Sequence, residues 1–431
     1  MKADLIIHNA RLVTCASNGT PKRAAAMQDV GLIENGAVAV AGGKIAAVGK
    51  SEEILREYES DQTIDANSAV VSPGFVECHT HVVFAGDRLN EFELKIKGAD
   101  YLEILQNGGG IISTVRQTRA ASLADLVDQS RKRLDKMLAL GVTTAEIKTG
   151  YGLDTATEFK MLEAILELDE HHPIELLPTF LPAHAVPPEF KENPDEYVDL
   201  ICREMLPKLR EWRESTYIDV DRMSFDYHRS KPFFVDVFCE RNAFDLEQSR
   251  KVLETAKALG FKLKAHVDEF TNLGGARMSI ELGATSIDHL DAISDEEIAL
   301  LADSETVGVV TPTVNFNFGS REFADARKFI DANCAVALST DYNPGSAPCP
   351  SLPNAMAIAC RYQKLLPSEA FNAATVNAAF AVAMGEKTGS LEAGKQADII
   401  IFDTKDYREI AYEFGGNLIK KVIKNGKIIN Q

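Results

Sequence analysis

Two histidines at the end of an apolar segment could together hold a metal ion. His79 and His81 follow residues 70–77, a run rich in residues that favour β-strands. Side chains two residues apart on a strand project from the same face, so both imidazoles can reach one cation. Two ligands are too few to hold a catalytic ion, and the others must come from elsewhere in the chain.

Three later apolar runs also end in a side chain that can bind a metal: His266, His289 and Asp341. A charged, helical stretch precedes each run. This alternation of strand and helix predicts an α/β fold, a parallel sheet closed into a (β/α)8 TIM-like barrel. Functional groups of such barrels gather at the C-terminal ends of the strands. We therefore expect these three residues to meet His79 and His81 at the barrel mouth.

The two ends of the chain differ from its middle, because both consist of short β-leaning segments with tight turns. Asn425-Gly426 separates two such segments and is typical of a two-residue hairpin turn. The predicted domains are a small β-sandwich formed by residues 1–69 and 376–431, and a barrel formed by residues 70–375. A polar stretch at 213–232 interrupts the alternation, and its role cannot be inferred from its composition.

Composition argues against several classes of protein. The formal net charge of −18 disfavours nucleic acid and anionic membrane surfaces as partners. No apolar stretch is long enough to span a bilayer, and the first residues do not resemble an export signal. The seven cysteines are odd in number and form no Cys-x-x-Cys pair, which favours a reduced, cytoplasmic protein.

The expected ligand set is His79, His81, His266 and Asp341. Three neutral imidazoles and one carboxylate suit one divalent metal ion, and nitrogen and oxygen ligands favour Zn or Fe. Such an ion lowers the pKa of bound water to about 7 and makes a hydroxide nucleophile available at neutral pH. The alternative interpretation is a set of separate buried polar residues, but their order at successive strand ends favours a metal centre.

Other residues near these ligands could move protons or hold the substrate. Glu269 lies three residues after His266 and could shuttle a proton to a leaving nitrogen, although a surface acid or helix cap is the alternative. His289 could polarise a carbonyl group or hold a ligand in place. His184 occupies a region where two-metal barrels carry a bridging lysine, which favours a single ion. For Lys148, a structural salt bridge is a better interpretation than a bridging ligand.

Longer segments carry a family resemblance. Residues 73–81 and 389–398 resemble the signatures of the amidohydrolase superfamily. Within it the chain is similar, over nearly its whole length, to the imidazolonepropionase family of histidine degradation. The segments that carry this second resemblance are 84–88, 108–111, 148–153, 183–188, 235–240 and 339–346.

The resemblance implies hydrolysis of the cyclic amide of 4-imidazolone-5-propionate to N-formimino-L-glutamate. It implies substrate contacts from Arg88, Tyr151, His184, Asn343, Gly345 and Ser346, and Tyr101 is a further candidate. From their positions beside the metal ligands, we assign catalysis to Glu269, His289 and Asp341, with Glu269 also in contact with the substrate. Arg88 would clamp the propionate carboxylate, and an acidic protein needs such a cation to bind an anionic small molecule. We further expect a homodimer.

Two rival functions remain open at this point. A nucleobase aminohydrolase would use the same barrel and the same His-x-x-Glu element, and would release ammonia. A non-catalytic assembly protein would have lost its metal, which the intact ligand set disfavours. The segments around Arg88 and Tyr151 favour the cyclic amidase.

Overall fold

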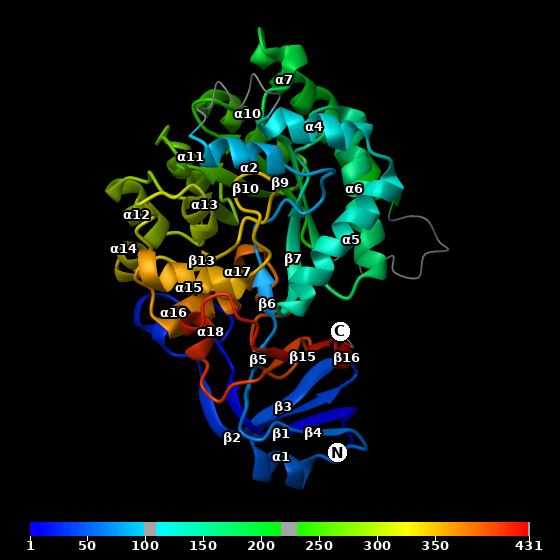
Figure 1. Cartoon of the computed structure of the whole chain (residues 1–431), viewed down its shortest axis with the longest axis vertical. Helices are drawn as coiled ribbons and strands as arrows, with labels where there is room; N and C mark the ends of the chain where they lie inside the picture. Colours follow the sequence, from blue (N-terminus) through cyan, green and yellow to red (C-terminus); the bar gives the residue numbers. More distant parts are fainter. Residues whose placement is uncertain (99–108, 217–230, 430–431) are drawn as a thin grey trace.

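Eight parallel strands form the barrel that the sequence predicts (Figure 1). The computed structural model describes residues 1–98, 109–216 and 231–429. Each barrel strand pairs with the next along the chain, in the order β6 (Phe75–Glu77), β7 (Val142–Lys148), β8 (Glu175–Ala183), β9 (Phe234–Cys239), β10 (Lys262–Val267), β11 (Ser286–His289), β12 (Val307–Val310) and β13 (Val336–Leu338). A parallel bridge between Thr80 and Tyr342 joins the chain just past β6 to the chain just past β13.

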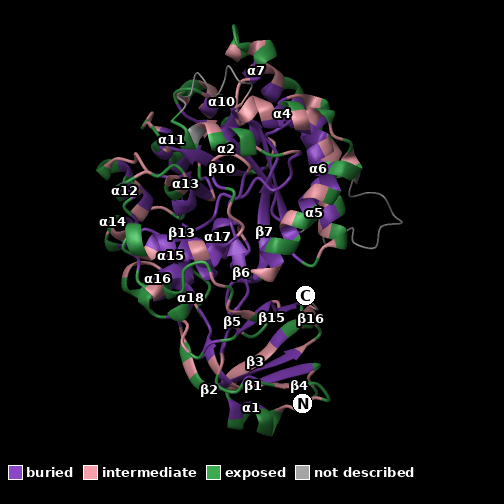
Figure 2. Cartoon of the chain, in the orientation of Figure 1, coloured by how far each residue is buried: buried purple, intermediate pink, exposed green. Residues whose placement is uncertain are grey.

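Helices surround this barrel and bury its strands (Figures 1 and 2). They are α2 (Leu89–Ile96), α4 (Ile111–Ala120), α5 (Leu123–Ala139), α6 (Thr155–His171), α7 (Pro194–Leu200), α8 (Leu206–Thr216), α10 (Leu246–Ala258), α11 (Gly275–Glu281), α12 (Asp295–Ala302), α13 (Pro312–Asn317), α14 (Ala326–Asp331), α15 (Leu352–Tyr362), α16 (Pro367–Ala373) and α17 (Val376–Ala381). Local sequence sets several starts. Ser122 caps α5 in a capping box with Asp125, and the Asp154 side chain caps α6.

The two chain ends join in the expected small β domain, as one continuous mixed sheet with both termini beside it (Figure 1). Its strands are β1 (Leu5–Val13), β2 (Leu32–Ala41), β3 (Lys44–Lys50), β4 (Thr63–Asp65), β5 (Val70–Pro73), β14 (Ile399–Phe402), β15 (Ile419–Lys424) and β16 (Lys427–Ile429). The short helix α1 (Ser51–Glu57) packs on this sheet, whereas α18 (Glu409–Tyr412) packs against α15 of the barrel. β15 and β16 form the predicted hairpin, with φ of 49° at Asn425 and 76° at Gly426.

The structure shifts both domain limits by a few residues. β5 pairs with β1 and β14, so Val70–Pro73 belongs to the mixed sheet and not to the barrel. α17 packs against β6, β12 and β13, so it belongs to the barrel. We therefore place the limits later in the chain than the predicted 69/70 and 375/376.

Two further expectations concern the cysteines and the membrane. All seven cysteines lie in described parts of the chain and are free thiols. Within residues 1–98, 109–216 and 231–429, no helix has the length and apolarity needed to cross a bilayer.

Candidate active site

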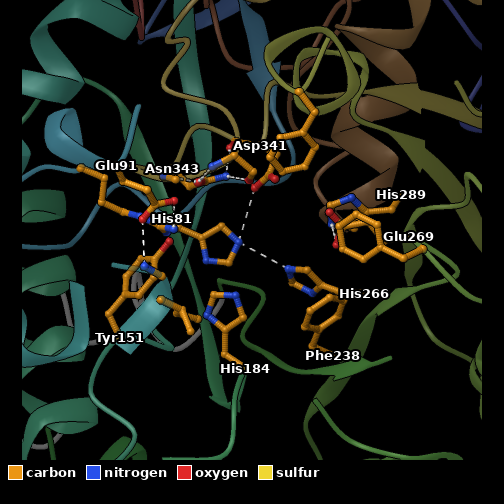
Figure 3. Close-up of a pocket in the computed structure, with 17 residues that line it drawn as sticks. His81, Glu91, Tyr151, His184, Phe238, His266, Glu269, His289, Asp341 and Asn343 are labelled. Atoms are coloured by element: carbon orange, nitrogen blue, oxygen red, sulfur yellow. Dashed lines mark hydrogen bonds and ion pairs between the residues drawn. The ribbon is translucent and has the colours of Figure 1, made fainter. Parts of the chain in front are cut away.

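Side chains from four strand ends converge at the barrel mouth, as the sequence predicts. His79 and His81 follow β6, His266 and His289 lie at the ends of β10 and β11, and Asp341 follows β13. His79 Nε2 and His81 Nε2 lie 3.4 and 3.5 Å from Asp341 Oδ1. His266 Nε2 lies 3.3 Å from His81 Nε2. Figure 3 shows His81, His266 and Asp341 directed toward a common point.

Buried carboxylates orient two of these imidazoles. His79 Nδ1 lies 2.7 Å from Asp288 Oδ2, and His266 Nδ1 lies 3.1 Å from Asp236 Oδ1. In each pair the Nδ1–H donates to the carboxylate, which leaves the Nε2 lone pair directed at the cluster. Carboxylate–histidine pairs of this kind typically fix the tautomer of a metal ligand.

The cluster fits a divalent metal ion. His79 Nε2 and Asp341 Oδ1 are buried and have no hydrogen-bond partner among the described residues. Burial of polar atoms without partners is costly, and a cation would satisfy them. Burial also lowers the pKa of His79 and of His81 well below the ordinary value, so both rings are neutral at pH 7 and offer lone pairs. The nitrogen and oxygen donors of His79, His81 and Asp341 all lie within 4.8 Å of one another.

Glu269 and His289 face the cavity from the side opposite Tyr151 (Figure 3). Glu269 Oε2 lies 3.9 Å from His289 Nε2. Burial raises the pKa of the Glu269 carboxyl well above its ordinary value, and the Asp341 carboxylate adds to this increase. His289 Nδ1 lies 3.1 Å from the Thr311 hydroxyl. A donated Thr311 O–H would keep the His289 proton on Nε2, toward the cavity.

Arg88 lies at another wall of the cavity, where it forms a bidentate ion pair. Its Nε and Nη2 donate to the two oxygens of Glu91 at 2.7 and 2.6 Å. Glu91 also accepts from the backbone N–H of Gly110 at 2.8 Å. A Cβ atom on Gly345 would lie 2.0 Å from Arg88 Nη1, so any other residue at that position would displace the guanidinium. Arg88, the expected clamp for the substrate carboxylate, thus already binds Glu91 along its Nε–Nη2 edge. The Nη1–Nη2 edge is left for a ligand.

Tyr151 and His184 lie on neighbouring loops beyond β7 and β8. His184 Nδ1 lies 3.0 Å from the carbonyl oxygen of Gly150 and donates to it, so Nε2 carries a lone pair. The His184 ring stacks on His81 with a centroid distance of 4.8 Å. Burial lowers the pKa of His184 to about 3.

The loop after β13 is held by the Asn343 side chain. Asn343 Oδ1 accepts from the backbone N–H groups of Gly345 and Ser346, both at 2.8 Å. Its Nδ2 donates to the Ser346 hydroxyl and to the Asp341 carbonyl, both at 2.7 Å. Asn343 therefore shapes this loop in addition to lining the cavity.

These groups line one cavity of about 330 Å³. Its lining includes all the predicted site residues except His79, which is fully buried, and Tyr101, which falls outside the described residues. Sequence reasoning missed other members of the wall, namely Glu91, Ile111, Phe238, Phe270 and Phe318. The spacing of Glu91 three residues after Arg88, on one helical face, was the available signal.

Lys148 forms the structural salt bridge that the sequence favours. Its ammonium lies 2.7 Å from both Glu146 Oε1 and Asp236 Oδ2, and all three side chains are fully buried. Asp236 in turn orients His266, so Lys148 acts on the cluster through a carboxylate.

Sequence comparison decides the family. Imidazolonepropionases of Chloroflexus aggregans and Herpetosiphon aurantiacus are each 51% identical to the chain, over 99% and 100% of it and 98% of each relative. The chain belongs to the imidazolonepropionase family. Residues 240–429 match the amidohydrolase family model, and residues 36–58 match that of the imidazolonepropionase-like composite domain of bacteria. Members of this family are hydrolases of carbon–nitrogen bonds, and so is this chain.

Solved structures show the same fold outside the imidazolonepropionase family. A triazine hydrolase variant has a TM-score of 0.73 at 17% identity, covering 99% of this chain and 94% of its own. Guanine deaminase of E. coli has a TM-score of 0.72 at 16% identity, covering 99% and 98%. At these identities the likeness concerns the fold alone.

Proposed function

We propose that the chain hydrolyses the cyclic amide of 4-imidazolone-5-propionate to N-formimino-L-glutamate, a step of histidine degradation. The observation that carries this proposal is one cavity with Arg88 at one wall and the imidazole–carboxylate cluster with Glu269 at the other. A substrate with a carboxylate on a short arm and an amide in a ring presents the two matching groups. The curated relatives that match the whole chain bear the corresponding name.

His79, His81, His266 and Asp341 would hold one divalent ion, with Zn and Fe as the candidates. Bound there, the ion would acidify a water molecule and polarise the amide carbonyl. Asp288 and Asp236 would keep His79 and His266 in the tautomer that offers Nε2.

Binding and orientation fall to residues around the cavity. Arg88 would hold the propionate carboxylate through its Nη1–Nη2 edge, because Glu91 occupies the other edge. Tyr151 and His184 would contact the imidazolone ring. The loop that Asn343 holds would present Gly345 and Ser346 to the substrate.

Glu269 would move the proton. Water adds to the ring carbonyl carbon, and the Glu269 carboxylate accepts a proton from that water. The same group then delivers the proton to the ring nitrogen as the C–N bond breaks. His289 Nε2–H would donate to the developing oxyanion. One water is added across one C–N bond, and no other reactant is needed.

Incubation of purified, metal-assayed protein with 4-imidazolone-5-propionate tests the proposal. We expect N-formimino-L-glutamate, with guanine, cytosine and hydantoin unchanged. Ammonia release from guanine or cytosine, without turnover of the imidazolone, would favour a deaminase instead.

A further inference from the structure

The loop between β7 and α6 is folded around one buried carboxylate, Glu158. Glu158 Oε1 accepts from the backbone N–H groups of Gly152 and Leu153 at 2.8 and 2.9 Å. Both of its oxygens accept from Gly150 N–H, at 3.2 and 3.1 Å. Three N–H groups of one short loop therefore converge on a single side chain, as amides do around a bound anion. The Glu158 side chain is fully buried.

The backbone of this loop is adapted to that carboxylate. A Cβ atom on Gly152 would lie 2.8 Å from Glu158 Oε1 and 2.6 Å from its backbone nitrogen, so only glycine allows the approach. Gly150 has φ of +100° and Leu153 has φ of +56°. A left-handed leucine persists only where its surroundings impose it. The carbonyl of Gly152 is also occupied, because Arg119 Nε donates to it at 2.7 Å.

The same loop carries two side chains of the active-site cavity. Tyr151 lies between the two glycines whose N–H groups Glu158 binds. The carbonyl of Gly150 accepts the His184 Nδ1–H, and a Cβ atom on Gly150 would lie 2.8 Å from that nitrogen. Glu158 itself does not line the cavity.

We propose that Glu158 is a positioning residue, which sets Tyr151 directly and His184 through the Gly150 carbonyl. An acid in the first turn of α6 would ordinarily be explained by the helix dipole. That explanation leaves three convergent N–H groups from outside the helix without a reason. The substrate roles of Tyr151 and His184 rest on the proposed function, whereas the anchoring of the loop does not.

Glu158→Gln tests this inference, because it keeps the size of the side chain but removes its charge and puts an NH2 donor in place of an oxygen that accepts from Gly150 N–H. Glu369→Gln is a matched control. Glu369 is also fully buried, and it accepts from Leu366 N–H and Arg327 Nη1, both at 2.7 Å and away from the cavity. Hydrogen exchange of the peptide 149–153 should accelerate in E158Q and not in E369Q. This measurement needs no substrate, so it decides the anchoring even where the proposed reaction fails.

Kinetics then separate positioning from mere stability. In metal-loaded E158Q we expect KM to rise at least about tenfold, as for a lost bond to a charged group. The metal content should equal that of the wild type. In a Tyr151→Phe, His184→Gln background, the same substitution should raise KM by less than about threefold, because the positioned groups are already gone. Unchanged exchange in E158Q would overturn the proposal. So would faster exchange with an unchanged KM, or a KM effect that is equal in both backgrounds.

Discussion

Glu269 combines a position over the cluster with a carboxyl whose pKa is raised by burial, so that it can accept a proton and hold it until the leaving nitrogen takes it. A proton shuttle acts in the chemical step and contributes little to substrate binding. We therefore expect Glu269→Gln to lower kcat by about 10²- to 10⁴-fold while KM changes much less. Steady-state kinetics on protein of equal metal content measure this. Small and equal changes in kcat and KM would remove Glu269 from the proton-transfer role.

Arg88 should contribute to binding and not to the chemical step. Arg88→Met removes a charge-assisted contact to the substrate carboxylate, and we expect KM to rise about 10- to 100-fold with kcat nearly retained. The substitution also removes the guanidinium from Glu91, which costs stability.

The double substitution Arg88→Met, Glu91→Gln separates these two effects. It should restore the melting temperature that Arg88→Met lowers, while KM stays high. Recovery of KM in the double variant would mean that Arg88 acts only as the counter-ion of Glu91.

The residues of the site could be predicted where chemistry and spacing are local. The pair His79 and His81, and Glu269 after His266, are such cases. The carboxylates that orient the imidazoles could not be predicted from the sequence. Asp288 reaches His79 across the barrel, and Asp236 reaches His266 from β9. Both contacts depend on strand register, which apolar runs alone do not specify.

At the scale of elements, the proposed ligands join strand ends that are far apart in the chain. His79 and His81 follow β6, His266 lies on β10 and Asp341 follows β13. When the free concentration of an ion is about a thousand times its dissociation constant, binding stabilises the folded state by about 4 kcal/mol. We expect a chelator to abolish activity and to lower the melting temperature, and zinc or ferrous iron to restore both.

His81→Ala provides the control for metal removal, because its melting temperature should respond little to the chelator. Metal analysis must accompany each measurement. A chelated wild-type protein that has lost its metal, yet melts at the original temperature, would show that the ion does not join these strands.

The apolar run before His79 forms two strands that belong to different sheets. Residues 70–77 divide into β5 in the mixed sheet and β6 in the barrel, with Gly74 between them. A Cβ atom on Gly74 would lie 2.1 Å from Thr143 Oγ1, so the chain passes close to β7 at this point. Hydrophobicity could not reveal the break, because both halves are fully buried.

At the scale of the whole molecule, a buried ion-pair network joins the barrel to the mixed sheet. Glu175 begins β8, and its Oε2 lies 3.4 Å from Lys424 Nζ of β15. Gln396 Nε2 donates to the same oxygen at 3.0 Å. Lys424 also pairs with Asp398 at 2.7 Å, and Lys231 lies 3.7 Å from Glu175 Oε1. The alternation of strands and helices predicts the barrel, and the short β-leaning segments at both chain ends predict the β domain. The contact between the two domains arises only from their packing.

This network should make stability depend on pH. Burial alone would raise the pKa of Glu175, but Lys424 and Lys231 lower it from 4.5 to about 2. Because the folded-state pKa lies below the unfolded one, the carboxylate stabilises the protein above pH 4.5, and this contribution is lost as the pH falls toward 2. Between pH 7 and 3.5, the free energy of unfolding should therefore fall by about 1 kcal/mol more in the wild type than in Glu175→Gln. Urea titrations at both pH values measure the difference, with the exposed Glu163→Gln as the control that should follow the wild type. Parallel pH profiles for the wild type and E175Q would mean that the lysines do not depress this carboxyl, and that the two domains are held together mainly by apolar packing.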